Sequence, residues 1–375
     1  MENPRIYLDV NASLPLRKEI RPFIAETLES LTRSGNPASI HAEGRSAENL
    51  VETAREQVAK YVGVKTSQVI FTSGGTEANA MAIQFLGTRL KMKDQVAKLG
   101  INGGSHASIR ENVLRLTGWY QQPFLSPDEL TDSNCSVIFE LAASNESGRI
   151  ADTAKTILAA RSMDALIHVD AVQVPGKLMN FEALNKADSY SLSGHKVGAL
   201  QGAGALIVSE EVSKWNIDAL IRGGGQERGR RSGTPSVLAI ATMGQAFTLP
   251  YDAEHCRTLA VSLRDGLVAK LNDKIIELSD CKQGLAGTLL IEFVGVKGDV
   301  MSAALDGAGV SASFGSACSS GEQEPSKSLI GEGISSDAAK TAIRFSIGPS
   351  TKAEEIDDAI ERIVSVQTQV SEAMA

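Results

Sequence analysis

Two short sequences that lie far apart carry the residues best suited to chemistry. The first is Ser-Gly-His-Lys at 193–196, where Lys196 follows a predicted strand and is placed as an amine that could hold a carbonyl cofactor. The second is Gly-Ser-Ala-Cys-Ser-Ser-Gly at 315–321, where Cys318 is flanked only by small residues and is expected to be exposed on a mobile loop. An amine and an accessible thiol together indicate sulfur chemistry on an amino acid.

Lys196 alone is weak evidence, because most lysines are solvated side chains. A pyridoxal phosphate site also needs a carboxylate facing the pyridine nitrogen and a turn that binds the phosphate. Asp170 ends a predicted buried strand, and the Ser-Gly-Gly-Thr turn at 73–76 opens a helix whose free amides attract a dianion. Taken singly, the aspartate could be a helix cap and the turn a tight connection. Together with the lysine they predict a pyridoxal phosphate site.

The bulk composition limits the other possibilities. The 375 residues, 42% of them hydrophobic, are enough for one large and one smaller domain. A net charge of -8 argues against direct binding of nucleic acid. No apolar run approaches the roughly 20 residues that span a bilayer, and the first residues show no basic or apolar start, so we expect a cytoplasmic protein without membrane association. The four cysteines lack the short mutual spacing of a metal site.

Apolar periodicity predicts an alternation of helices and short buried strands in the first two thirds of the chain. Helices are expected over 16–32, 42–61 and 153–161, and strands over 68–73, 135–141, 165–169, 189–192 and 203–208. This alternation is typical of an α/β fold with a mainly parallel sheet and helices on both faces. The predicted large domain covers 16–252.

The pattern changes after residue 252. A helix to 271, a strand over 288–294, a helix from 299, a strand over 342–347 and a closing helix from 353 are expected there. They predict a smaller α+β domain, formed by 1–15 and 253–375, that carries the Cys318 loop.

A series of motifs runs nearly from end to end of the chain. They lie at 7–12, 35–41, 72–79, 145–148, 168–173, 193–196, 223–227, 231–234, 315–318 and 343–348. In these motifs and their order the chain resembles the cysteine desulfurases of the NifS/IscS kind, which are class-V, fold-type I pyridoxal-phosphate enzymes. The resemblance implies a large domain with a mainly parallel seven-stranded sheet flanked by helices, plus a smaller α+β domain.

The resemblance also implies residue roles around the cofactor. Lys196 corresponds to the Schiff-base lysine, Asp170 to the partner of the pyridine nitrogen, and His106 to the histidine that stacks on the ring and assists proton transfer. Asn145 and Gln173 correspond to the polar side chains near the ring hydroxyl.

The phosphate and the substrate have implied partners of their own. The phosphate-binding positions are Gly75, Thr76, Ser193 and His195, with Thr234 reaching the phosphate from the other subunit of a homodimer. Arg344 is similar to the arginine that receives the substrate carboxylate, a task suited to a planar charged fork, and Asn11 to a secondary substrate contact.

The reaction implied by the resemblance uses both Lys196 and Cys318. L-Cysteine displaces the lysine from the cofactor, the freed amine moves the α-proton, and the Cys318 thiolate attacks the substrate sulfur, which leaves a persulfide on the protein and releases L-alanine. The nine residues from Cys318 to Ser326 resemble the long-loop group, which passes sulfur to acceptor proteins such as an iron–sulfur scaffold.

Several positions depart from the family pattern, and other functions stay open. Ser105 stands where a glutamate often precedes the histidine, Val10 replaces an asparagine, and the residues at 143–144 and 198–202 are unusual. Alternatives are a selenocysteine lyase, a lyase of the cysteine sulfinate type, a divergent binding module for sulfur transfer, and a purely structural protein. The thiol loop favours a desulfurase among these.

Overall fold

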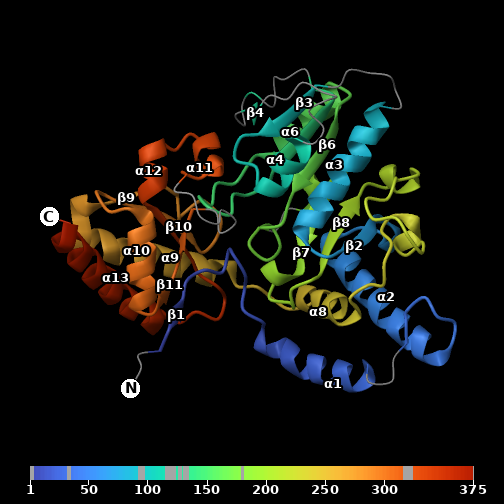
Figure 1. Cartoon of the computed structure of the whole chain (residues 1–375), viewed down its shortest axis with the longest axis horizontal. Coiled ribbons are helices and arrows are strands. Elements are labelled where there is room, and N and C mark those ends of the chain that lie inside the picture. The colour runs from blue at the N-terminus through green and yellow to red at the C-terminus, as the bar shows by residue number, and fades with distance from the viewer. Residues whose placement is uncertain are drawn as a thin grey trace.

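The protein has a larger and a smaller lobe (Figure 1). The computed structural model describes residues 4–31, 35–91, 98–114, 124–125, 129, 135–178, 181–315 and 324–374. Figure 1 shows the elements from α1 to α8 in the larger lobe, and β1 together with the C-terminal elements from β9 to α13 in the smaller one.

The larger lobe is built on a seven-stranded sheet, counted over the described residues, with the strand order β2-β8-β7-β6-β5-β3-β4. The strands are β2 Val69–Thr72, β3 Leu99–Asn102, β4 Phe124–Leu125, β5 Val137–Leu141, β6 Leu166–Asp170, β7 Ser189–Ser193 and β8 Gly204–Val208. Only β8 is antiparallel to its neighbours. The predicted mainly parallel, seven-stranded α/β sheet is therefore confirmed.

Helices cover both faces of this sheet, because successive strand residues point to opposite sides. Ile138 packs with α2, α6 and α8, whereas its neighbours Val137 and Phe139 pack with α3 and α4. The helices of this lobe are η1 Lys18–Ile20, α1 Arg21–Leu31, α2 Ala42–Val62, η2 Thr66–Gln68, α3 Gly75–Lys91, α4 Ala107–Leu114, α6 Thr153–Ser162, α7 Phe181–Leu184, η3 Gly194–Lys196, η4 Val212–Lys214, η5 Glu227–Gly229 and α8 Val237–Phe247.

The smaller lobe holds a four-stranded antiparallel sheet in the order β12-β13-β10-β9, beside the parallel pair β1-β11. Its strands are β1 Ile6–Tyr7, β9 Ile275–Glu277, β10 Thr288–Phe293, β11 Val310–Ser311, β12 Ser313–Phe314 and β13 Ala342–Ser346. Its helices are α9 Ala253–Leu271, η6 Asn272–Lys274, α10 Gly298–Gly307, α11 Lys327–Gly331, α12 Ser336–Thr341 and α13 Ala353–Met374.

The predicted elements match the structure to within a few residues, and local signals explain the agreement. Helix α9 begins after Asp252, whose carboxylate accepts a hydrogen bond from the backbone N–H of His255. Helix α2 ends at Gly63, which has the positive φ of a C-terminal cap. The prediction missed α8, because its sequence VLAIATMGQAF is apolar on almost every side and lacks an amphipathic period.

The hydrophobic core is divided between the lobes. Ile6 and Leu8, near the N-terminus, are buried with residues 259–366 and not with the large sheet. This distribution agrees with a small domain formed by 1–15 and 253–375, although the boundary at 252 stays a prediction. Among the described helices, none combines the length and the apolar character needed to cross a membrane.

Replacing Leu8, which is fully buried, tests this division. The Leu8→Ala variant is expected to lose about 2–5 kcal/mol of stability through the cavity it leaves. Amide hydrogen exchange should then speed up in β10 and β13 and not in β5 to β7. Leu192→Ala, in the core of the larger lobe, is the matched control and should show the opposite pattern. An equal response of both lobes to either change would contradict two separate domains.

Candidate functional site

The parallel strands bring most of the predicted residues to one edge of the large sheet. Asp170 ends β6, Ser193 ends β7, and Asn145 follows β5. His106 follows β3, and Gly75 opens α3 directly after β2. Since all of these strands run in the same direction, their carboxyl ends lie along the edge where ligands of α/β sheets usually bind.

Asp170 lies at the centre of this edge and is buried, with 4% of its surface exposed. Its Oδ2 accepts a hydrogen bond of 2.8 Å from the Asn79 amide, and its Oδ1 accepts one of 3.1 Å from the backbone N–H of Val172. No lysine, arginine or histidine in the described part of the chain forms an ion pair with it. A buried carboxylate that has hydrogen-bond donors and no cation is suited to a cationic ligand.

A chain of hydrogen bonds fixes the carboxylate from behind. Asn79 Oδ1 lies 3.0 Å from His168 Nε2, and His168 Nδ1 lies 2.9 Å from the Ser189 hydroxyl. Burial lowers the pKa of His168 to about 4, so the ring is neutral at pH 7. A neutral ring can donate from Nε2 to Asn79 and accept at Nδ1 from Ser189, which leaves the Asn79 NH₂ group pointing at Asp170.

His106 is held beside the same carboxylate. Its Nδ1 accepts a hydrogen bond from the backbone N–H of Ser108 at 3.1 Å, so Nε2 carries the proton of the neutral ring. Burial is the main cause that lowers its pKa, and the nearby charges of Lys196 and Arg110 lower it further against the opposing effect of Asp170. The structure therefore places a neutral imidazole within electrostatic range of both Asp170 and Lys196.

Four of the predicted phosphate-binding residues lie at the start of α3 and at the end of β7: Gly75 and Thr76 open α3, Ser193 ends β7, and His195 follows in η3. Gly75 must be a glycine, because a Cβ atom there would lie 2.6 Å from the side chain of Val172. The first-turn amides of this helix have no intrahelical acceptor. Ser193 Oγ lies 3.2 Å from His195 Nδ1, and burial lowers the pKa of His195 to about 4, so this ring is also neutral at pH 7.

Lys196 reaches back to the N-terminal segment. Its Nζ donates hydrogen bonds to the backbone oxygens of Asn11 and Ala12, the second at 2.8 Å. Asn11 itself is almost fully buried, and its Nδ2 donates to Thr288 Oγ1 at 2.9 Å and to the Asn145 oxygen at 3.2 Å. The proposed substrate contact of Asn11 stays a prediction, since its amide is occupied by protein groups here.

Gln173 and Lys177 also form hydrogen bonds to Asn11. Gln173 Nε2 donates to the Asn11 backbone oxygen at 3.0 Å, and Lys177 Nζ donates to Gln173 Oε1 at 3.0 Å and to Asn11 Oδ1. Lys177 was not predicted as a site residue. The available signal was its position, four residues after Gln173 in the turn that follows β6. This spacing was not interpreted from the sequence alone.

Arg344 enters the site from the smaller lobe, on β13. Its guanidinium pairs with Asp9 and donates to the Asn145 backbone oxygen at 2.8 Å and to Ser313 Oγ at 2.9 Å. Its Nε is buried and has no hydrogen-bond partner among the described residues. An orphaned donor of this kind fits an anionic ligand such as a carboxylate.

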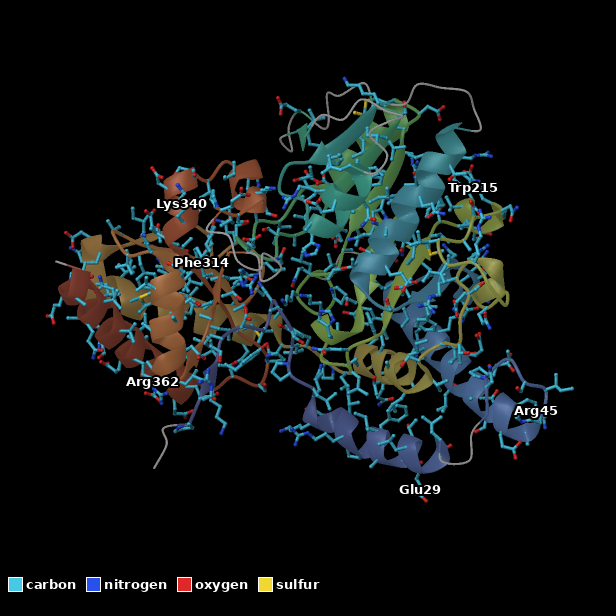
Figure 2. All side chains as sticks on the ribbon, in the orientation of Figure 1. Glu29, Arg45, Trp215, Phe314, Lys340 and Arg362 are labelled. Atoms are coloured by element: carbon cyan, nitrogen blue, oxygen red, sulfur yellow. The ribbon has the colours of Figure 1, made fainter. Side chains whose placement is uncertain are left out.

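Residues 316–323, called here the Cys318 segment, are preceded and followed by described residues that lie near this arginine. Ser313 Oγ, which accepts from Arg344, donates to Asp9 at 2.8 Å, and Phe314, labelled in Figure 2, ends the same strand in the smaller lobe. After the segment, Ser326 Oγ donates to Glu146 Oε1 at 2.9 Å. Cys318 itself lies outside the described residues. Since it is five residues from Ser313, the chain length alone keeps it within about 18 Å of that residue.

Helix α11, just after this segment, docks on the strand end that carries His106. The Ser328 hydroxyl donates to the Ser105 backbone oxygen at 3.3 Å and accepts from Arg110 at 3.2 Å. Gly331 crosses Gly103 so closely that a Cβ on Gly331 would lie 2.0 Å from the Gly103 oxygen. The described ends of the Cys318 segment are therefore anchored to both lobes.

One predicted residue, Thr234, is not joined to this cluster, and the three other cysteines were not predicted to belong to it. Thr234 lies exposed on the loop before α8, and no hydrogen bond connects it with the cluster in the described chain, so its role across a dimer stays a prediction. The other cysteines, Cys135, Cys256 and Cys281, are all buried, and none of them forms a disulfide within the described residues. Burial raises the pKa of Cys256 to about 11 and that of Cys281 to about 12, which disfavours a thiolate at either position.

Sequence reasoning missed the groups that support Asp170. Asn79 lies in the 72–79 motif and His168 in the 168–173 motif, but neither had been given a role. His168 shares a face of β6 with Asp170 because it lies two residues earlier. Asn79 is an amide among the apolar residues of α3, and its burial was the signal that a partner had to exist.

Pyridoxal phosphate fits this donor set. Asp170 supplies a buried anion that has no cationic partner in the described ranges, α3 supplies first-turn amides beside Ser193 and His195, and Lys196 supplies an amine. The side-chain amide of Asn145 has no hydrogen bond within the described residues, which leaves it for a ligand. The residues present therefore match the ring, phosphate and carbonyl of the cofactor.

Comparison with known proteins supports the same chemistry. The family model named Aminotransferase class-V matches residues 6–358. A curated relative from Dictyoglomus turgidum, called cysteine desulfurase IscS, is 33% identical over 98% of this chain and 96% of its own length. A solved structure called NifS-like protein has a TM-score of 0.84 at 25% identity, covering 97% of this chain and all of that one. Another, titled SspA in complex with cysteine, has a TM-score of 0.75 at 26% identity, covering 92% and 99%.

His168 makes stability depend on pH. Its pKa falls from 6.5 in the unfolded chain to about 4 in the fold, so the unfolded state binds the extra proton as the pH drops. The stabilisation is complete above pH 6.5 and is lost toward pH 4, by on the order of 3 kcal/mol. His168→Gln should flatten this loss in denaturant unfolding measured at pH 7.5 and pH 5.0. Identical pH dependence in both proteins would show that His168 is not the titrating group.

Proposed function

Because this chain belongs to the class-V aminotransferase family, we propose that it is a pyridoxal-phosphate-dependent cysteine desulfurase that converts L-cysteine to L-alanine and holds the sulfur as a persulfide on Cys318. One observation carries the proposal more than any other. The residues on either side of the Cys318 segment are hydrogen-bonded next to Arg344 and Asn145, so the tether that bears the thiol starts and ends at the candidate site.

The cofactor supplies the electron sink that weakens the bonds at the α-carbon of the substrate. The protein groups would hold it from three sides. Asp170 would receive the ring nitrogen, the amides of α3 with Ser193 and His195 would bind the phosphate, and Lys196 would bind the carbonyl carbon. The hydrogen bonds from Asn79 and Val172 keep the Asp170 carboxylate in place before the ring arrives.

Proton transfer falls to Lys196 and His106. The Lys196 amine is held in a mainly buried setting by hydrogen bonds to two backbone carbonyl oxygens, so Nζ lies close to the site, where we expect it to take up the α-proton of cysteine. His106 is kept neutral by burial and presents its Nε2–H, so it can stack on the ring without adding a second positive charge.

Arg344 would position the amino acid through its carboxylate. The arginine is itself fixed by Asp9, Ser313 and the Asn145 backbone, and it retains a buried Nε–H for a ligand. Because Ser313, which is hydrogen-bonded to Arg344, precedes Cys318 by only five residues, a carboxylate bound at Arg344 would lie close to the point where the described chain leads toward the thiol.

The sulfur transfer balances without an external oxidant. The carbon–sulfur bond of cysteine breaks while a sulfur–sulfur bond forms at Cys318. The carbon skeleton keeps the electron pair of the broken bond and takes a proton, which gives alanine. The buried thiols Cys256 and Cys281 are poor candidates for this attack because their pKa values are raised.

The wider setting belongs to the same proposal. We expect a homodimer in which Thr234 contacts the phosphate of the partner subunit, a cytoplasmic location, and acceptor proteins such as an iron–sulfur scaffold that take the sulfur. The exposure of Thr234 in the isolated chain is compatible with such a contact.

The thiol assignment can be tested with purified protein, pyridoxal phosphate and L-cysteine. The unmodified chain should form alanine, and intact mass should show one added sulfur atom that maps to Cys318. Cys318→Ala should lose at least about 99% of alanine formation, because Cys256 and Cys281 are buried with raised pKa values and are poor nucleophiles. Cys256→Ala is the matched control and should keep the activity. Normal alanine production by Cys318→Ala under reducing conditions would rule out the persulfide role.

The cofactor assignment has a separate test. Lys196→Ala should lose the visible absorbance of covalently attached pyridoxal phosphate and all turnover of cysteine, because the amine that binds the carbonyl is gone. Lys186→Met, on an exposed lysine near β7, should leave both unchanged. If Lys196→Ala keeps the spectrum and the turnover, another residue holds the cofactor.

A further inference from the structure

Lys177 is a buried lysine next to the site whose function none of the predicted roles explains. Only 4% of its surface is exposed, and no carboxylate of the described residues forms an ion pair with it. Its Nζ donates instead to two neutral oxygens, Gln173 Oε1 at 3.0 Å and Asn11 Oδ1. A buried amine with no anion is costly, so the contacts it makes require an explanation.

The charges around Lys177 do not compensate for its burial. Lys196 and Arg344 face it with the same sign, and Cys256 is the remaining ionisable group within range. Burial, with smaller contributions from Lys196 and Arg344, lowers the pKa of Lys177 to about 7. Both the neutral amine and the ammonium have at least two N–H groups, so the two hydrogen bonds can persist in either state.

We propose, on the basis of the desulfurase function above, that Lys177 is a positioning residue. It orients the Gln173 amide toward the cofactor ring and holds Asn11 in hydrogen-bonding contact with Lys196. The local chain makes this possible. Gln173 and Lys177 are four residues apart in the turns after β6, where the Val174 oxygen accepts from the backbone N–H groups of Lys177 at 3.1 Å and of Leu178 at 2.9 Å. The two side chains are thereby brought to the same side.

The orientation of Gln173 follows from the hydrogen-bonding groups around it. An amide side chain has one oxygen that accepts and one NH₂ group that donates, and the ammonium form of Lys177 can offer only donors to it. The ammonium therefore keeps the Gln173 oxygen turned toward Nζ, as observed, and the NH₂ group turned away. One N–H of that group donates to the Asn11 backbone oxygen at 3.0 Å, and the other remains to donate to the ring hydroxyl.

The Lys177 amine also fixes the orientation of the Asn11 side chain. The Asn11 side-chain oxygen accepts from Lys177, while its backbone oxygen accepts from both Gln173 and Lys196. Asn11 is the point where the N-terminal segment joins β10 and β13, through Thr288 and Ser346. Removing the Lys177 donor would leave two buried oxygens unsatisfied, and both amides would have to rearrange around Lys196.

The first experiment measures the pH midpoint at which the visible absorbance of the bound cofactor changes. Lys177→Met keeps the length and removes both donors. The variant loses a positive charge near the cofactor, and Gln173 no longer holds an ordered donor at the ring oxygen. Both losses favour the protonated form of the bound cofactor, so the midpoint should rise by about 1 pH unit. Lys177→Arg keeps the charge and donors and should stay near the unmodified value. Lys186→Met controls for loss of a lysine elsewhere.

The second experiment is a double-mutant cycle on kcat for cysteine. Lys177→Met should lower kcat about tenfold through misplacement of groups, with little change in KM. If Lys177 acts through Gln173, the losses of Lys177→Met and Gln173→Leu should not multiply in the double variant. Fully multiplicative losses, or an unchanged midpoint in a folded Lys177→Met protein, would overturn the proposal.

The role of Lys177 can be tested independently of whether the protein turns over cysteine. The absorbance titration needs bound cofactor and no turnover, so a shifted midpoint supports Lys177 as a positioning residue even if cysteine proves not to be the substrate. Thermal unfolding of each apoprotein shows whether a variant has folded. If Lys177→Met does not fold, Lys177→Gln, which is neutral and shorter, should show the same upward shift, and its absence would count against the proposal.

Discussion

The site depends on a buried negative charge, Asp170, that the protein surrounds with hydrogen-bond donors and that has no counter-ion among the described residues. Asp170 is fixed by Asn79 and by a backbone N–H, and Asn79 is oriented in turn by the neutral ring of His168. Hydrogen bonds offset part of the cost of burying this carboxylate, and a cation that reaches it would offset more. The protonated ring nitrogen of pyridoxal phosphate would be that cation, so the polar chain behind Asp170 constrains which ligand the sheet edge can accept.

A second constraint is that the two lobes must meet at the same place. Asp170, Ser193 and His106 come from the strand ends of the larger lobe, whereas Arg344 and strand β12, which precedes Cys318 in the chain, come from the smaller one. Asn11 joins them, because its backbone receives Lys196 and Gln173 while its side chain contacts Thr288. The chemistry proposed here requires both halves, since one binds the cofactor and the other brings the carboxylate receptor and the thiol.

Much of the architecture was predictable from the periodicity of apolar residues. The strands that end in Asp170 and Ser193 are short buried runs between amphipathic helices, and that pattern is sufficient for a mainly parallel sheet. The two-residue strands β1, β11 and β12 were not predicted, because so short a strand carries no period and forms only where distant segments meet. The apolar helix α8 was missed for the opposite reason, since burial on all sides removes the amphipathic signal.

For the site, the sequence by itself determined the types and the order of the reactive groups: an amine at 196, a carboxylate at 170, an arginine at 344 and a thiol at 318. Only the tertiary structure decided what supports them. Asn79 behind Asp170, and Lys177 beneath Gln173 and Asn11, are contacts between segments separated by up to 166 positions. Such contacts leave no local signal, because they arise from the burial of polar groups that must find partners once the chain is compact.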